Sequence, residues 1–145
     1  MFKEENSGSP EHNQKVLCRV IEEGFNKGNY AALDALFAPD YLEHQFSLKK
    51  TLEGFKEDLQ FLRTGFPDFH LTIEDISADT EKVWIRMTAR GTNLGPFMGP
   101  PTGKPITVIV MDVCRFEGGK IVEHWGVPDR FAVLAQLGLL PQPGQ

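Results

Sequence analysis

Apolar and polar residues alternate with a helical period in the first part of the chain. Apolar side chains recur every three to four positions from Val16 to Phe25, with charged residues between them. This spacing predicts an amphipathic helix that starts near Asn13 and ends at Gly28. The polar residues 1–12 are expected to form a loose lead-in.

Two further helices are expected before the pattern changes. Asn29 can cap a shorter helix, which Pro39 prevents from continuing. A short extended piece at 41–44 follows. The third helix is predicted over 51–64, with its first residue as the cap and Gly65 as its exit.

From Phe69 onward the period of the apolar residues drops to two. This predicts half-buried strands over 69–74 and 82–90, joined by a turn. A loop rich in glycine and proline then spans 91–103 and carries Phe97 and Met98. Loops of this kind commonly close over a site.

The most apolar part of the chain is predicted to be a long β-hairpin. Its two β-branched runs, Thr107–Phe116 and Ile121–Asp129, are joined at Glu117-Gly-Gly-Lys120. A short apolar helix is expected to follow over 131–140, and Pro141 ends it.

The hairpin admits two registers. A two-residue Gly-Gly turn would place Asp112 opposite Trp125, whereas a three-residue loop ending in a left-handed Gly119 bulge would place Asp112 opposite His124. We favour the bulge, because a glycine before Lys120 suits the left-handed conformation. Asp112 and His124 would then be neighbours on one face of the sheet.

Helices followed by strands with short turns predict one α+β domain over 1–145, with N-terminal helices packed on a strongly curved, mainly antiparallel sheet. The strand Thr107–Phe116 is apolar on both faces. The helices can cover only one face, so we expect a second copy of the chain to cover the other in a homodimer.

Composition excludes several classes of partner. The net charge is −5 and no basic stripe occurs, which argues against nucleic acid binding. No apolar run reaches 18 residues and the N-terminus is polar, so we expect a cytoplasmic protein with no membrane partner. Cys18 and Cys114 are expected to be small buried hydrophobes rather than a disulfide.

Asp112 is the residue with the most unusual surroundings. A carboxylate inside so apolar a run must be hydrogen-bonded, neutralised or facing a cavity, because an unpaired buried charge is too costly. Asp112 and His124 could form an acid/base couple or a structural ion pair. His44 could face a cavity or the solvent, and Phe97, Met98 and Trp125 suit either a core or the walls of a pocket for a flat apolar ligand.

The common cofactor motifs are missing from the sequence. The histidines show neither His-x-His nor His-Glu-x-x-His spacing, so no metal is expected. Gly-x-Gly-x-x-Gly, a phosphate loop and Gly-x-Ser-x-Gly are also absent, which removes the commoner nucleotide-binding and serine-hydrolase interpretations.

Several segments together resemble the SnoaL-like polyketide cyclase family over nearly the whole chain after Gln14. They are Phe66-Pro-Asp68, the loop from Gly91 to Gly99, Pro101–Lys104, the segment from Arg115 to Asp129 that contains His-Trp-Gly-Val-Pro-Asp, and Gln136–Leu140. The resemblance implies the cone-shaped fold of the nuclear-transport-factor-2 superfamily, usually dimeric, with a pocket between the helices and the concave sheet. It also implies ring closure by an intramolecular aldol reaction without a metal or organic cofactor.

The resemblance assigns the acid/base role to Asp129, whose pKa an apolar pocket would raise enough to remove a proton from a carbon flanked by carbonyls. His124, Asn93 and His44 are the available donors to the enolate, and Asp112 could orient His124. Relatives often carry histidine where this chain has Asn93, and an amide can donate a hydrogen bond but cannot shuttle a proton. The implied substrate is a small, apolar, carbonyl-bearing molecule.

Three alternatives stay open at this point. The fold also hosts isomerases and epoxide hydrolases, which could use the same pocket, and non-catalytic or stress-related dimers that bind an apolar metabolite. Asp129 itself could be the ordinary N-cap of the last helix instead of a catalytic group.

Overall fold

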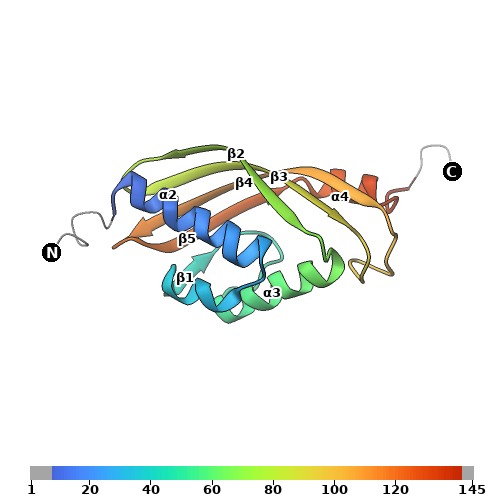
Figure 1. Ribbon diagram of the computed structural model, residues 1–145, viewed down its shortest axis with the longest axis horizontal. Coiled ribbons are helices and arrows are strands. Elements are labelled where there is room, and N and C mark those ends of the chain that lie inside the picture. Colours follow the sequence, from blue (N-terminus) through green and yellow to red (C-terminus); the bar gives the residue numbers. More distant parts are fainter. Residues whose placement is uncertain (1–7, 142–145) are drawn as a thin grey trace.

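The computed structural model describes residues 8–141, with helices on one side of a five-stranded sheet (Figure 1). The elements are α2 (Pro10–Arg19), η1 (Val20–Asn26), η2 (Tyr30–Ala35), β1 (Phe37–Glu43), α3 (Leu52–Gly65), β2 (His70–Ala78), β3 (Lys82–Thr92), β4 (Pro105–Glu117), β5 (Lys120–Pro128) and α4 (Arg130–Gln136). The strand order is β1-β5-β4-β3-β2, and all neighbours are antiparallel except β1 and β5. The predicted α+β architecture is confirmed.

The first helix begins earlier than predicted. Ser9 caps α2 by accepting a hydrogen bond from the backbone N–H of His12, and Pro10 suits the first helical turn because it needs no N–H donor there. The expected lead-in over 1–12 is therefore wrong for residues 10–12, and residues 1–7 lie outside the described part. The helix continues beyond Arg19 as a π-helical segment, η1.

The predicted second helix is a short 3₁₀ segment, and a strand follows where only a brief extended piece was expected. Phe37 is the first residue of β1 and Pro39 lies inside it. Proline is tolerated because β1 is an edge strand, where an N–H is not needed for pairing. This parallel edge strand makes the sheet mixed.

The remaining elements follow the sequence pattern more closely. Thr51 caps α3, its hydroxyl accepting from the N–H of Gly54 at 3.0 Å. The alternating residues of β3 are buried as predicted. The last helix is shorter than expected: α4 ends at Gln136, and Gly138 with a φ of +74° turns the chain before Pro141.

The hairpin register differs from both predicted registers. Gly118 and Gly119 form a two-residue turn with φ values of +58° and +79°, so Phe116 faces Ile121. The pairing then shifts at Val122, which is an extra residue on β5, and Asp112 lies opposite Gly126. Because of this one-residue bulge, Asp112 and His124 both point to the helical side of the sheet, so they share a face as predicted.

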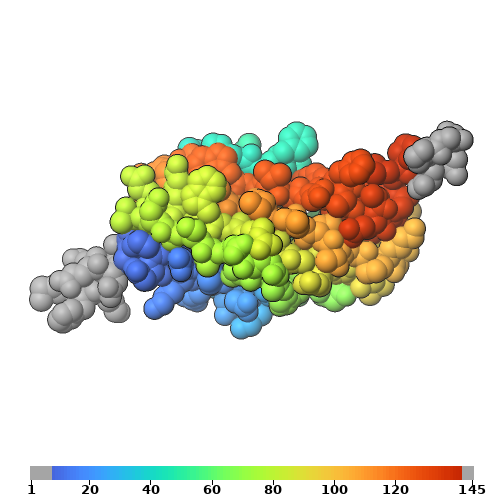
Figure 2. All heavy atoms as spheres, turned by 90° about the horizontal axis from the view of Figure 1, so that it is seen from above, coloured from blue at the N-terminus to red at the C-terminus, as the bar shows by residue number. Residues whose placement is uncertain are grey.

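The two faces of the sheet have different surroundings. The inner face packs against the helices and contributes most of the core, including Val83, Met87 and Cys114. The outer face is seen bare of helices over much of its area in Figure 2. No helix within residues 8–141 has the length and apolar character needed to cross a membrane.

Candidate functional site

A cavity of about 400 Å³ lies between the inner face of the sheet and α3. Its walls are mainly aromatic and aliphatic, and six of the eleven phenylalanines line it: Phe25, Phe55, Phe61, Phe66, Phe69 and Phe97. Polar side chains are few and include Gln45, Asp112 and Arg130. An apolar hollow of this size with a few polar groups is typical of a site for a small organic ligand.

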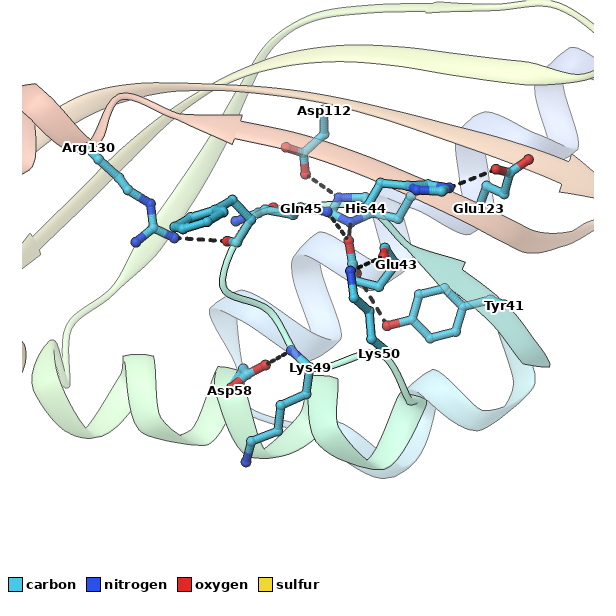
Figure 3. A network of polar contacts seen from close by, with 12 residues as sticks. Tyr41, Glu43, His44, Gln45, Lys49, Lys50, Asp58, Asp112, Glu123 and Arg130 are labelled. Atoms are coloured by element: carbon cyan, nitrogen blue, oxygen red, sulfur yellow. Dashed lines mark hydrogen bonds and ion pairs between the residues drawn. The ribbon is translucent and has the colours of Figure 1, made fainter.

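Three buried ionisable side chains meet beside this cavity. Asp112 and Glu43, both labelled in Figure 3, contact different ring nitrogens of the His124 imidazole. The Nδ1 atom lies 2.6 Å from Glu43 Oε2 and the Nε2 atom lies 3.0 Å from Asp112 Oδ2. We call Glu43, His124 and Asp112 the buried trio.

The three residues of the buried trio come from three neighbouring strands of the sheet. Glu43 ends β1, His124 lies in β5 and Asp112 lies in β4. The Glu43 side chain is fully buried, and it also accepts hydrogen bonds from the Tyr41 hydroxyl at 3.3 Å and the Gln45 N–H at 3.0 Å. These donors fix its orientation, as a buried carboxylate requires.

The two carboxylates decide the protonation of His124. Burial alone lowers its pKa, but the hydrogen bonds and negative charges of Asp112 and Glu43 outweigh this and raise the pKa to about 10. At neutral pH the ring is therefore an imidazolium, and each ring nitrogen donates to one carboxylate. His124 has no free lone pair with which to accept a proton or bind a metal.

Asp112 is the member of the trio that meets the cavity. Its Oδ2 accepts from His124, while Oδ1 is buried and has no hydrogen-bond partner within residues 8–141. An unpartnered buried carboxylate oxygen is costly unless something else engages it. Asp112 is also one of the few polar residues that line the apolar cavity, so its second carboxylate oxygen is an unused hydrogen-bond acceptor in the cavity wall.

Glu43 was not singled out from the sequence. A signal was present, because the buried Tyr41 and Glu43 alternate with the exposed Leu42 and His44 in the manner of a half-buried strand. Of the two positions left open for His44, the outer one is observed, because the period of two turns its ring to the face opposite that of Glu43.

His44 and Trp125 lie together on the outer side. Their rings stack with centroids 4.8 Å apart, and His44 Nε2 lies 2.8 Å from Glu123 Oε2. Trp125 borders a groove on the outer face rather than the cavity, because it alternates with His124 along β5. The prediction that Trp125 and His44 line the substrate pocket is corrected accordingly.

Asp129 does not join the trio. Its carboxylate caps α4 by accepting from the N–H of Ala132 at 3.0 Å, the residue is exposed, and it is not among the residues that line the cavity. The N-cap, which was the alternative interpretation of Asp129, is the observed one. Of Asp112 and Asp129, Asp112 is the one that lines the cavity.

The glycine-rich loop contributes walls but no donor. Phe97 and Met98 line the cavity as predicted. Asn93 is fully buried, but its amide is occupied: it donates to the carbonyl oxygens of Gly65 and Gly95 and accepts from Thr102. Asn93 therefore holds the loop against the end of α3 and does not face a ligand.

No cluster of three or more His, Cys, Asp or Glu side chains within residues 8–141 is arranged to hold a metal ion. The three residues of the buried trio instead hydrogen-bond to one another, with His124 between the two carboxylates. The chemistry its geometry supports is proton transfer by Asp112 at an apolar site, with His124 supplying a fixed positive charge behind it.

Several solved structures are similar to this chain over most of its length. IdmH from Streptomyces antibioticus, a candidate polyketide cyclase, is 34% identical over 87% of this chain and 98% of its own, with a TM-score of 0.79. TsrD from Streptomyces laurentii is 26% identical over 90% of this chain and 97% of its own, with a TM-score of 0.82. AclR from Streptomyces galilaeus, a candidate hydroxylase, is 26% identical over 92% of this chain and its whole length, with a TM-score of 0.81.

Among curated proteins, none matches this chain significantly. The family model of SnoaL-like polyketide cyclases matches residues 15–137, which include all three residues of the trio and most of the cavity wall. On this match, together with the solved structures and the nuclear-transport-factor-2-like fold, the chain belongs to the SnoaL-like polyketide cyclase family.

Proposed function

We propose that this protein is a cyclase-type enzyme that removes a proton from the carbon next to a carbonyl in a small apolar substrate. The observation that carries the proposal is the unpartnered Oδ1 of Asp112 at the cavity wall. Membership of a cyclase family and the candidate cyclase IdmH support the same class of reaction.

The reaction needs only proton transfer and one new carbon–carbon bond. Asp112 Oδ1 takes the α-proton and the carbon–hydrogen electrons move onto the carbonyl oxygen as an enolate. The enolate carbon attacks a second carbonyl of the same molecule, and Asp112 returns the proton to the alkoxide that forms. No electron acceptor or donor is required.

His124 has a supporting role in this proposal. As an imidazolium it cannot accept the proton, but its Nε2–H holds Asp112 through Oδ2 and leaves Oδ1 for the substrate. Glu43 in turn holds His124 through Nδ1. Both are positioning residues, whereas Asp112 is the catalytic base.

The proposal is tested by deuterium exchange, which detects enolate formation without knowledge of the natural substrate. The probe is 2-tetralone, a bicyclic apolar ketone, incubated with protein in deuterium oxide and followed by mass spectrometry. Wild-type protein should accelerate exchange, and Asp112→Asn should lower the acceleration by about 10²- to 10⁴-fold, the usual contribution of a general base.

Asp129→Asn is the matched control, since it changes the same functional group outside the cavity. It should exchange 2-tetralone like wild type. If Asp129→Asn abolished exchange and Asp112→Asn retained it, the roles proposed for these two aspartates would be reversed. If wild-type protein bound apolar ketones without accelerating exchange, a binding protein would be the better interpretation.

We further propose that the outer face of the sheet pairs with a second copy. Trp84, Met111 and Val127 are 54%, 51% and 70% exposed there, beside a groove that Trp125 also lines. Exposed apolar patches of this kind mark interfaces. Light scattering should give a dimer mass for the wild type and the 16.3 kDa monomer mass for Met111→Lys; a monomeric wild type would contradict the pairing.

A further inference from the structure

The loop between β1 and α3 brings one side-chain amide to the cavity without a partner. Gln45 lines the cavity, and its hydrogen bonds within residues 8–141 are made by its backbone: the N–H donates to Glu43 Oε2 and the carbonyl accepts from Leu48 at 3.2 Å. The half-buried side chain is left for a ligand. A polar group so placed in an apolar site is a specificity determinant by default.

Gln45 lies next to the unpartnered oxygen of Asp112. A Cβ atom on Gly126 would collide with Gln45 Oε1 and would lie 2.7 Å from Asp112 Oδ1. Both side-chain ends therefore converge on one point above β5, which is open because residue 126 has no side chain. Gly126 lies within β5 and has no positive φ. The space taken by the ends of Gln45 and Asp112, and not the backbone conformation, therefore requires a glycine here.

The position of Gln45 is fixed from both sides. The same Glu43 oxygen that accepts from His124 also accepts from the Gln45 N–H, so the buried trio fixes the backbone position of Gln45. On the far side, Arg130 donates to the carbonyl oxygen of Phe46 and to the hydroxyl of Ser47 at 2.6 Å. Figure 3 shows Gln45 between Arg130 and Asp112.

We propose that Gln45 donates a hydrogen bond to the carbonyl oxygen of the substrate while Asp112 Oδ1 removes the neighbouring proton. Rotation of the amide about its last bond exchanges its oxygen and nitrogen, which brings the NH₂ donor to the point above Gly126. The donor then stabilises the enolate oxygen as charge develops on it. This inference rests on the proposed function, and it names a second catalytic residue for it.

Two probes separate the contribution of the Gln45 hydrogen bond from that of apolar contact with the cavity. 2-Naphthol is a flat mimic of the enol of 2-tetralone, and naphthalene has the same rings without the oxygen. Wild-type protein should bind 2-naphthol more tightly than naphthalene in fluorescence titrations. Gln45→Met should reduce this preference by about tenfold, the effect of one hydrogen bond, and leave naphthalene affinity unchanged.

Two further variants sharpen the test. Gln60→Met, on the exposed side of α3, makes the same chemical change away from the cavity and should keep the wild-type preference. Gly126→Ala should lose the preference, since its Cβ displaces both polar groups. In the 2-tetralone assay, Gln45→Met should lower the exchange rate more than it weakens ketone binding.

The outcomes separate the two proposals. A wild-type preference for 2-naphthol that Gln45→Met leaves intact overturns the role of Gln45 and leaves Asp112 as the base. Equal wild-type binding of both probes also overturns it, while the apolar cavity stands. If the wild type binds neither probe, the proposed function falls together with this inference.

Discussion

Two histidine–carboxylate contacts lie on opposite faces of the same sheet, and they differ in nearly every property that determines function. On the inner face His124 meets two carboxylates, and the imidazole and both carboxylate side chains are at most 9% exposed. On the outer face His44 contacts one carboxylate among residues 8–141, that of Glu123, and its side chain is 38% exposed. The distances are similar, at 2.6 to 3.0 Å inside and 2.8 Å outside.

Surroundings, rather than residue type or distance, decide what such a contact can do. Water screens the outer pair, so its contribution to stability is small. Inside, where water is excluded, the two carboxylates fix the imidazolium, and Asp112, which lines the cavity, keeps one oxygen without a partner among residues 8–141. His44 is not among the residues that line the cavity or the outer groove.

The largest difference is expected when each histidine is replaced by leucine. His124→Leu leaves Asp112 and Glu43 buried without their shared cation, so the free energy of unfolding should fall by about 3–5 kcal/mol. His44→Leu should cost less than about 1 kcal/mol. Urea denaturation followed by circular dichroism measures both, and equal losses would remove the contrast between the faces.

The pH dependence of stability should separate the faces next. The folded-state pKa of His124 is raised from 6.5 to about 10, so its stabilising contribution is complete below pH 6.5 and is lost as the pH rises through 10. The unfolding temperature of wild-type protein should therefore fall more between pH 6.5 and pH 10 than the unfolding temperature of His124→Leu. Parallel pH curves for the two proteins would argue against a charged ring.

A small effect is expected at Asp129, the carboxylate that the family resemblance favoured. Asp129→Ala removes the cap of α4 and should cost about 1 kcal/mol of unfolding free energy, without a change in 2-tetralone exchange. Asp129→Ser, which keeps a capping oxygen, should restore most of the stability. Loss of exchange in a fully folded Asp129→Ala protein would bring this residue back into the site.

The fold was predictable because the apolar period is regular along most of the chain. It changes from helical spacing in α3 to alternation in β3, and both elements appear where expected. β1 was missed because proline and alanine weaken its strand pattern, and because its partner β5 is far away in sequence. Parallel pairing at a sheet edge leaves little local signal.

The site was predictable in part. Asp112 and His124 were predicted to share a face of the sheet. This held because the two-residue turn and the one-residue Val122 bulge each shifted the register by one position, so the sum of the two shifts kept both side chains on the predicted face. Glu43 and Gln45 were missed, because their position depends on where the β1 edge meets β5. Asp129 was assigned by resemblance, and its local role as a helix cap took precedence.

The most direct test of the account is the charge of His124 itself. Nitrogen-15 NMR spectra of protein labelled at histidine, with the signal assigned by its loss in His124→Leu, report whether both ring nitrogens carry protons. The account predicts an imidazolium that persists well above pH 6.5 and titrates near pH 10. A ring that is already neutral at pH 8 would contradict it.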